Sequence, residues 1–242
     1  MTDITLLDGS IGQEIVKRTG DAPTPLWSTS VMMDKPEVLR DVHADYFNAG
    51  ATIATTNTYA VHIDRLEPVD LQDQQSALLQ TAMSEARVAR DAHGSGRIAV
   101  ALGPLGASYR PDIKTPLEEG AAAFQSIVSQ LEHDADLVLI ETASSLHHAQ
   151  TALMGCAHTN KPVWLALSVD DTDGTKLRSG EPLSDIAKPS RQPPCFSTAH
   201  ALKPSARDCH YSLLSASPSE PTPTASHTSQ KASCKTHQQS TH

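Results

Sequence analysis

Five short apolar runs alternate with longer amphipathic stretches through the first 188 residues, and this alternation constrains the fold more than any other feature. Each run is apolar on both faces, which is typical of a parallel strand buried between two layers. The runs are ITLLDG (4–9), TIATTNT (52–58), RIAVALG (97–103), DLVLIET (136–142) and PVWLALSV (162–169). Strands and helices in repeated alternation predict a parallel sheet with βαβ crossovers, so the expected fold class is α/β.

The stretches between the apolar runs carry helix signals. Segment 36–50 begins with a proline and ends at a glycine, which are common residues at the two ends of a helix. Segment 70–92 has its aliphatic residues at helical spacing, and segment 117–134 has acidic residues in its first turn, where they favour a helix N-terminus. A fourth helix is expected within 144–159, after the fourth strand.

Five such units fit either an open doubly wound sheet or most of a β/α barrel, and spacing alone leaves both open. No G-x-G-x-x-G sequence follows the first strand, so the dinucleotide-binding form of the doubly wound fold loses its main support. Polar and turn residues gather where the strands end, at 8–9, 55–58, 103–104, 141–142 and 168. Barrel active sites are built at that end of the strands, so we expect the functional residues there.

The composition changes at Pro189. Ser, Thr, Pro, His and Gln dominate the residues after it, and large aliphatic side chains nearly vanish. Such a segment cannot bury enough apolar surface to offset the entropy of ordering. We therefore predict one domain over residues 1–188 and a disordered tail over residues 189–242.

Charge and hydropathy argue against several classes of partner. The formal net charge is −9, which gives no electrostatic support for binding nucleic acid. No apolar run approaches the roughly 20 residues needed to span a bilayer, and the first residues carry no secretory signal. We expect a cytoplasmic protein with no nucleic-acid partner and no membrane partner.

Several motifs resemble those of one known family. LLDGSIGQEI resembles the family's LLDGGxGTEL opening, and KPEVLRDVHADYFNAGATIATTNTYA resembles its second-strand region almost throughout. The segments LWST, GPLGA, DLVLIETASSLHHAQ and KPVWLALSVDDTDGTKLRSGEPL also occur in family order and spacing. Over residues 4–188 the chain is similar to the homocysteine S-methyltransferases, which are zinc-dependent (β/α)8-barrel enzymes. The resemblance implies an incomplete TIM barrel of about five of the eight βα units.

The resemblance also implies a reaction and a substrate site. Family members transfer a methyl group to homocysteine and so form methionine, and this sequence looks more like the members that use S-methylmethionine or a similar donor. Asp8, Gly9 and Asn57 match positions of the substrate pocket. Glu141 matches the carboxylate that receives the amino group of the substrate, a charge-assisted contact. Without the family, Asp8 and Gly9 are typical of a turn and Asn57 of a loop cap.

The family's zinc ligands are not recognisable in this sequence. Family members hold zinc with three cysteine thiolates, one in an Asn-Cys pair and two in a Gly-Gly-Cys-Cys motif, and the metal activates the homocysteine thiol. Neither motif occurs around the four cysteines, which are Cys156, Cys195, Cys209 and Cys234. Cys156 is expected to be a small buried residue, and a flexible tail gives the other three no fixed geometry. We predict that this chain does not bind zinc, that it has no catalytic residues of its own and that it does not transfer methyl groups.

Three histidines lie in the helical stretches, at His43, His147 and His148. We interpret them as solvated or packed surface side chains, not as metal ligands.

A shift of reading frame offers an explanation for the break after Lys188. Back-translated and read from the third base of each codon, PSRQPPCFSTAHALKPS permits VAATAVLFNCSRPEAV, which resembles the family's sixth strand with its Asn-Cys pair. We hypothesise that the gene or its assembled sequence carries a frameshift near codon 188, and the alternative is a genuine tail. Three classes of function stay open: an active methyltransferase, a non-catalytic amino-acid-binding protein and a non-functional fragment.

An incomplete barrel has two unpaired strand edges. ITLLDG lacks an eighth-strand partner and PVWLALSV lacks a sixth-strand partner, so both expose backbone groups to which another chain can pair. We therefore expect self-association through these open edges.

Overall fold

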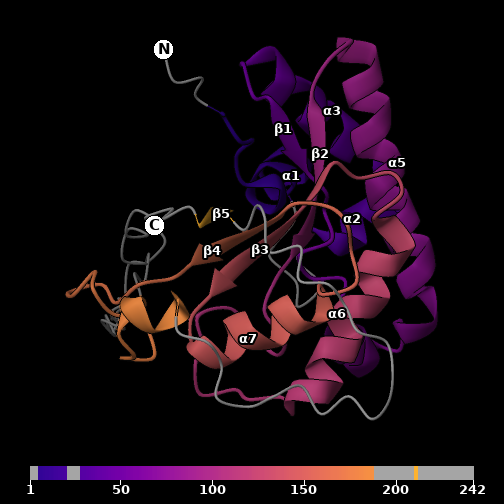
Figure 1. The fold of residues 1–242 in the computed structure, drawn as a ribbon. Coiled ribbons are helices and arrows are strands. Elements are labelled where there is room, and N and C mark those ends of the chain that lie inside the picture. Colours follow the sequence, from indigo (N-terminus) through magenta and orange to yellow (C-terminus); the bar gives the residue numbers. More distant parts are fainter. Residues whose placement is uncertain (1–4, 21–27, 188–209, 212–242) are drawn as a thin grey trace, which may run out of the picture.

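The computed structural model describes residues 5–20, 28–187 and 210–211, and the structural statements below concern these residues. They contain a five-stranded parallel sheet in the order β1-β2-β3-β4-β5 (Figure 1). The strands are β1 (Ile53–Thr55), β2 (Arg97–Leu102), β3 (Leu137–Ala143), β4 (Val163–Leu167) and β5 (His210–Tyr211).

Helices connect the strands as the sequence predicts. The α-helices are α1 (Ile11–Thr19), α2 (Thr29–Asp34), α3 (Pro36–Asn48), α4 (Ile63–Leu66), α5 (Gln75–His93), α6 (Leu117–Leu131) and α7 (Leu146–Gly155). Three short 3-10 helices are η1 (Glu67–Val69), η2 (Gln72–Gln74) and η3 (Leu183–Ala187). The helices predicted within 36–50, 70–92, 117–134 and 144–159 are confirmed as α3, α5, α6 and α7.

Local sequence explains where several of these helices begin and end. The hydroxyl oxygen of Ser145 accepts a hydrogen bond from the backbone N–H of His148 and so caps the first turn of α7. Helix α5 ends at Gly94, whose φ of 84° lies in the left-handed region that closes many helices. Pro36 opens α3, where the absent N–H of proline costs no hydrogen bond.

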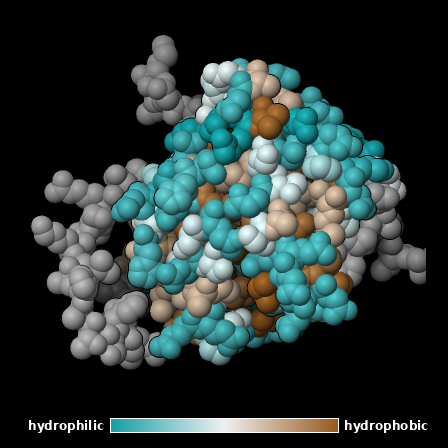
Figure 2. Space-filling model, turned by 90° about the vertical axis from the view of Figure 1, so that its right-hand side faces the viewer, coloured by the Kyte–Doolittle hydropathy of each residue, from teal (hydrophilic) through white to brown (hydrophobic). Residues whose placement is uncertain are grey.

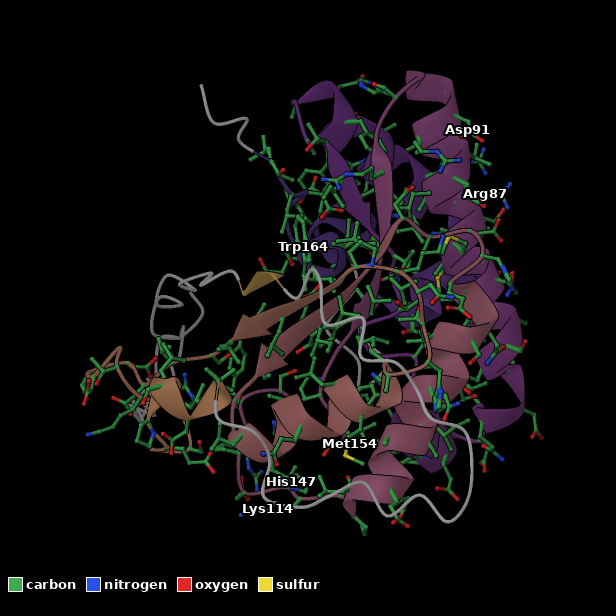
Figure 3. All side chains as sticks on the ribbon, in the orientation of Figure 1. Arg87, Asp91, Lys114, His147, Met154 and Trp164 are labelled. Carbon is green, nitrogen blue, oxygen red and sulfur yellow. The ribbon has the colours of Figure 1, made fainter. Side chains whose placement is uncertain are left out.

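The two faces of the sheet have different partners. One face packs against the long helices in the main apolar core, through strand residues such as Val100, Ile140 and Leu165. The opposite face holds a separate small cluster of strand residues, Ile53, Ala99, Leu137 and Leu139, with Trp164 packed against it (Figure 3). Helices α6 and α7 lie on one side of the sheet in Figure 1. Consecutive strand order with one helical layer is typical of a β/α barrel and differs from a doubly wound sheet, whose helices cover both faces.

The α/β class with a parallel sheet is therefore confirmed, whereas the incomplete barrel stays a prediction. The predicted first strand, 4–9, is wrong in extent, because its described residues form only a bridge between Leu7 and Ile53. Two backbone hydrogen bonds flank that bridge, from Asp8 N to Ile53 O at 3.1 Å and from Thr52 N to Leu6 O at 2.8 Å. Its partner strand is also shorter than the predicted 52–58, because the chain turns at residues 57–60.

The predicted tail contains one described element. His210 and Tyr211 pair in parallel with Trp164 and Leu165 of β4. The expectation that the strand at 162–169 has no partner on its sixth-strand side is therefore wrong over two residues. The remaining residues of the tail, and hence its predicted disorder, lie outside the described part of the chain.

The outer side of the helical layer is mainly hydrophilic in the view of Figure 2. Exposed large apolar side chains occur singly, such as Met33, Val88 and Met154, and scattered residues of this kind are normal on a protein surface. Among the described residues, no helix combines the length and the apolar character needed to cross a membrane.

Candidate active site

Two carboxyl groups lie at the carboxyl end of the sheet, where the side chain of Asp8 is buried and Glu141 is half-buried. Asp8 follows the bridge at Leu7, and Glu141 lies near the end of β3. The Asp8 carboxylate accepts hydrogen bonds from Thr55, at 2.7 Å from the backbone N and at 3.0 Å from the hydroxyl. Its side chain is only 2% exposed. Both carboxyl groups were predicted as substrate-binding residues, and the fold places them in one region, since the charge of Asp8 acts on Glu141.

Burial raises the pKa of both carboxyl groups towards neutrality. Burial raises the pKa of Asp8 to about 7, and this shift is opposed by the hydrogen bonds from Thr55, which favour the ionised form. Burial also raises the pKa of Glu141 to about 7, and the negative charge of Asp8 adds to this shift. Near neutral pH each carboxyl group is thus only partly ionised, because burial disfavours the charged form and, for Glu141, the charge of Asp8 adds to that effect.

Within residues 5–20, 28–187 and 210–211, neither carboxyl group forms an ion pair with a lysine or an arginine. The basic group within ion-pair distance of Asp8 in this part of the chain is His43, whose Nδ1 atom lies 4.0 Å from the carboxylate. Buried carboxylates in proteins are normally paired or hydrogen-bonded. The arrangement therefore favours a positively charged ligand between the two groups, which would ionise both of them.

A β-bulge lies next to Glu141. Ile140 pairs with Leu165 and Ala143 pairs with Leu167, so two residues of β3 stand opposite Ala166 alone. The two residues are Glu141 and Thr142, and the φ of Thr142 is +60°. Bulges of this kind interrupt the ladder and change the direction of side chains, often beside functional sites.

Asn57 stands apart from the carboxyl pair. Its side-chain oxygen accepts a hydrogen bond from the hydroxyl of Ser28 at 2.6 Å, and its side-chain amide lies 3.8 Å from the sulfur of Met32. Within the described residues, no hydrogen bond joins Asn57 to Asp8 or Glu141. Asn57 therefore ties the start of α2 to the end of β1, and its predicted contact with substrate stays a prediction.

Gly9 packs closely against the ring of Tyr46. A Cβ atom at this position would lie 2.7 Å from the hydroxyl oxygen of Tyr46, closer than real Cβ contacts allow. The Tyr46 hydroxyl donates a hydrogen bond to the backbone oxygen of Ser10 at 3.3 Å. The tyrosine thereby fixes the loop that carries Asp8.

His43 was not recognised as part of this region. Its predicted surface location is wrong, because the side chain is fully buried beside Asp8. Burial lowers the pKa of His43 to about 4, so the imidazole is neutral at physiological pH. Helical periodicity could have predicted this burial. His43 lies four residues from both Leu39 and Phe47, which are buried on the same face of α3.

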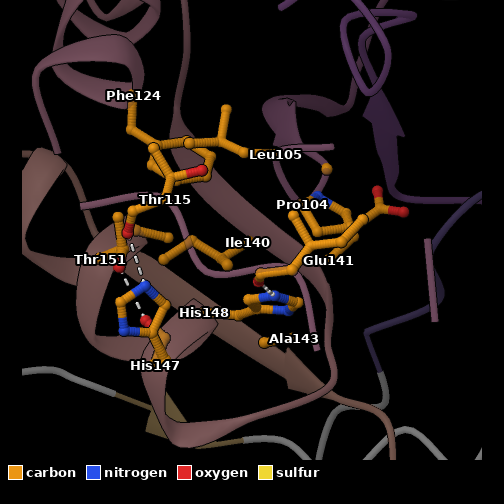
Figure 4. Close-up of a pocket in the computed structure, with 13 residues that line it drawn as sticks. Pro104, Leu105, Thr115, Phe124, Ile140, Glu141, Ala143, His147, His148 and Thr151 are labelled. Carbon is orange, nitrogen blue, oxygen red and sulfur yellow. Dashed lines mark hydrogen bonds between the residues drawn. The ribbon is translucent and has the colours of Figure 1, made fainter. Parts of the chain in front are cut away.

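The other two histidines hold a loop. His147 Nε2 lies 2.7 Å from the backbone oxygen of Thr115, and His148 Nε2 lies 3.0 Å from that of Ile113 (Figure 4). Carbonyl oxygens only accept, so both Nε2 atoms carry the proton. His147 is partly buried, which agrees with its interpretation as a packed surface side chain, whereas His148 is buried, so its predicted surface location is wrong.

These histidines line a small cavity of about 20 Å³, enough for one water molecule. Its walls are mainly apolar and come from the loop after β2, from β3 and from α7. Figure 4 shows the Glu141 carboxylate turned away from His147 and Thr115. This cavity is too small for an amino acid, so we place the candidate site on the Asp8 side of Glu141.

The described residues do not fit a zinc site. They contain no group of three or more His, Cys, Asp or Glu side chains arranged to hold a metal ion. Cys156 is buried at the end of α7, which confirms its interpretation as a small core residue. Cys195, Cys209 and Cys234 lie outside the described residues, so the prediction that this chain binds no zinc stays a prediction.

Comparisons with known proteins agree with the resemblance seen in the sequence. A family model described as homocysteine S-methyltransferase matches residues 5–205. The homocysteine S-methyltransferase of Escherichia coli K12 is 31% identical over 204 residues, which are 76% of this chain and 64% of that protein. Homocysteine S-methyltransferase YbgG of Bacillus subtilis 168 is 27% identical, with the same two coverages of 76% and 64%. The chain thus spans less than two thirds of the length of these relatives.

A solved structure is also similar. The metallated form of the homocysteine methyltransferase MmuM from Escherichia coli matches with a TM-score of 0.69 and 29% sequence identity. The match covers 76% of this chain and 69% of that structure.

Proposed function

Because the chain belongs to the homocysteine S-methyltransferase family, we propose that it binds homocysteine through the buried carboxyl groups of Asp8 and Glu141. The α-ammonium group of the amino acid would lie between the two carboxylates. The supporting observation is that these buried acids have raised pKa values and no lysine or arginine partner among the described residues.

The chemistry of this contact follows from charge. An ammonium ion donates up to three hydrogen bonds, so it can serve both carboxylates at once. Thr55 already holds the Asp8 carboxylate in place with two donors, while the Glu141 carboxyl has no hydrogen-bond partner among the described residues. The ammonium group would therefore supply the hydrogen-bond donor that Glu141 lacks. Its binding would displace the proton that the two carboxyl groups hold at neutral pH.

The reaction of the family is methyl transfer to homocysteine, from S-methylmethionine or a similar donor by the resemblance described above. We propose that this chain as it stands does not perform that transfer. The support is that the three-thiolate zinc site implied by the resemblance has no counterpart among the four cysteines of the sequence. The chain would then be a methyltransferase-like protein that retains amino-acid binding. The alternative is a non-functional product of a frameshifted gene.

Isothermal titration of the full chain with homocysteine tests the binding proposal. Glu141→Gln and Asp8→Asn should each weaken binding about 10- to 100-fold, since a hydrogen bond to a charged group contributes roughly 1.5–3 kcal/mol. Glu118→Gln, which removes an exposed carboxylate on α6, is the matched control and should bind as the wild type does. A wild-type chain that binds no homocysteine at millimolar concentration, or binding that both pair variants leave unchanged, contradicts the proposal.

A further inference from the structure

Helix α3 contacts the loop that carries Asp8 with two side chains. His43 and Tyr46 are three residues apart and therefore lie on the same face of the helix. The hydroxyl of Tyr46 donates a hydrogen bond to the backbone oxygen of Ser10, and its ring packs against Gly9. The Nδ1 atom of His43 lies 4.0 Å from the carboxylate of Asp8. Tyr46 thus holds the backbone of the loop, whereas His43 faces the charged side chain.

The ring of His43 is fully buried without a hydrogen bond. Its side chain is 0% exposed, and neither ring nitrogen has a hydrogen-bond partner in the described part of the chain. Leu39 and Phe47, one turn away on either side, are apolar and buried. A buried polar group without a partner costs free energy, so an imidazole that only filled space here would destabilise the fold. The position of His43 therefore indicates a polar role.

Asp8 is the group that His43 can serve. Its carboxylate accepts hydrogen bonds from the backbone N and the hydroxyl of Thr55, on the β1 side. The two oxygens of a carboxylate offer about four acceptor sites, so the ionised form can accept a further donor. Three acids on α1, α3 and α5 are paired with arginines instead: Glu14 and Asp45 with Arg18, and Glu85 with Arg40.

The tautomer of His43 follows from this placement. A neutral imidazole carries one N–H group, on Nδ1 or on Nε2, and its other nitrogen accepts. With the proton on Nε2, a bare nitrogen would face the Asp8 carboxylate and a buried donor would have no acceptor. With the proton on Nδ1, the N–H group can donate to the carboxylate. A movement of about 1 Å brings the two atoms from 4.0 Å to an ordinary hydrogen-bond distance.

We propose that His43 is a positioning residue, whose Nδ1–H group donates a hydrogen bond to the ionised carboxylate of Asp8 from helix α3, while Thr55 holds the same carboxylate from β1. Because this donor is neutral, it stabilises the negative charge without cancelling it. A lysine or an arginine in its place would cancel the charge that attracts a cationic ligand. The identity of that ligand rests on the proposed function, whereas the hydrogen bond from His43 does not.

Two variants of the full chain isolate the donor. Leucine and asparagine have the same branched shape, so His43→Leu and His43→Asn differ in the amide group that asparagine can offer to Asp8. His62→Leu is the matched control, because His62 is also fully buried but packs edge-on against Phe124, with the ring centres 5.4 Å apart. Circular dichroism and thermal unfolding check that each variant is folded.

Two NMR measurements read out the hydrogen bond. Nitrogen-15 NMR of the wild-type imidazole at pH 8, where Asp8 is mainly ionised, should show the proton of His43 on Nδ1. Carbon-13 NMR of the Asp8 carboxyl should show its pKa rising from about 7 by about one pH unit in His43→Leu, because the ionised form loses a donor. The pKa of Asp8 should return towards the wild-type value in His43→Asn and stay at that value in His62→Leu.

Titration with homocysteine at pH 7 relates this hydrogen bond to the proposed function. Binding should weaken about fivefold in His43→Leu, because a smaller fraction of Asp8 is ionised and ready to receive the ammonium group. Binding should stay within about twofold of wild type in His43→Asn and His62→Leu.

The outcomes distinguish this inference from the proposed function. A wild-type chain that binds no homocysteine contradicts the proposed function, and the two NMR measurements then decide the role of His43. A proton on Nε2 at pH 8, or an Asp8 pKa that is the same in folded His43→Leu and His43→Asn, overturns the positioning role. A proton on Nδ1, with an Asp8 pKa that rises in His43→Leu and returns in His43→Asn, supports it, since a residue needed only for packing would not distinguish these two variants.

Discussion

The Nδ1 atom of His43 lies 4.0 Å from the carboxylate of Asp8, and the exposed fractions of the two side chains are 0% and 2%. Neither ring nitrogen of His43 has a hydrogen-bond partner within the described residues. Burial shifts the two groups in opposite directions, since it lowers the pKa of His43 to about 4 and raises that of Asp8 to about 7. Burial therefore favours the neutral form of each group. The folded protein loses stability as the pH falls and His43 is protonated, and it also loses stability as the pH rises and Asp8 is ionised.

Replacing His43 with Leu should make the protein more resistant to acid. The folded-state pKa of about 4 lies below the unfolded value of 6.5, so the unfolded chain binds the proton more readily as the pH falls from about 6.5 to 4. The wild type should lose on the order of 2 kcal/mol over that window relative to His43→Leu. Urea unfolding at pH 7.5 and pH 4.5 measures this difference. Parallel losses in both proteins would show that His43 does not titrate between folded and unfolded states.

Replacing Glu141 with Gln should have the opposite pH signature. The folded-state pKa of about 7 lies above the unfolded value of 4.5, so the contribution of this group to stability is fully present below about pH 4.5 and is lost as the pH rises through 7. At pH 8 the variant should gain about 2 kcal/mol over wild type relative to their difference at pH 4. Unfolding at both pH values measures the gain, and Glu118→Gln should show none.

The chain should form no methionine from homocysteine and S-methylmethionine. Without a zinc site that lowers the pKa of the homocysteine thiol, most of the sulfur stays protonated near neutral pH and attacks a methyl donor poorly. The assay uses purified full chain with zinc supplied, and metal analysis gives the zinc content per chain. Turnover at an ordinary enzymatic rate, or one tightly held zinc per chain, would contradict this expectation.

Gly9→Ala should destabilise the fold by about 1–3 kcal/mol, the usual cost of an inserted methyl group in a tightly packed place. The new Cβ atom would overlap with the ring and hydroxyl of Tyr46. In a Tyr46→Ala background the same substitution should cost much less, and the cycle of four proteins measures the coupling. Equal costs in the two backgrounds would show that the contact does not limit position 9.

The purified chain should self-associate. The bridge at Leu7 gives the β1 edge little cover, and β5 covers two residues of β4. Exposed strand edges form hydrogen bonds with other chains. Size-exclusion chromatography with light scattering at several concentrations should show oligomers or aggregates. A monomer at every concentration, with one sharp thermal transition, would mean that the edges are protected.

Much of the fold could be read from the sequence because its signals are local. The proline and glycine that bound segment 36–50 predict α3 to within two residues, and the apolar runs predict the order of β1 to β4. The bulge could not be read, because an extra residue near a strand end leaves the apolar pattern intact. Pairing of β5 was missed since its two residues, His210 and Tyr211, carry no strand pattern.

The candidate site shows a similar division. Asp8 and Glu141 stand out in the sequence because acids at the ends of apolar strands need a partner, and the fold brings them together. Burial of His43 was missed because a single polar residue among apolar ones on a helix is usually interpreted as lying at the edge of the apolar face, where solvent can reach it. The left-handed backbone of Thr142 could not be read either, because a β-branched residue rarely adopts it and no local pattern marks it.

The candidate site depends on the number of residues in β3, because the bulge adds one residue between Ile140 and Ala143. Loss of the single codon for Thr142 would leave Ile140 and Ala143 opposite their present partners, Leu165 and Leu167. The shortened strand would keep its core and lose the left-handed backbone at Thr142, and Glu141 would lose the bulge that now sets its direction. In evolutionary terms, an in-frame deletion of one codon can switch off the site while the domain stays intact.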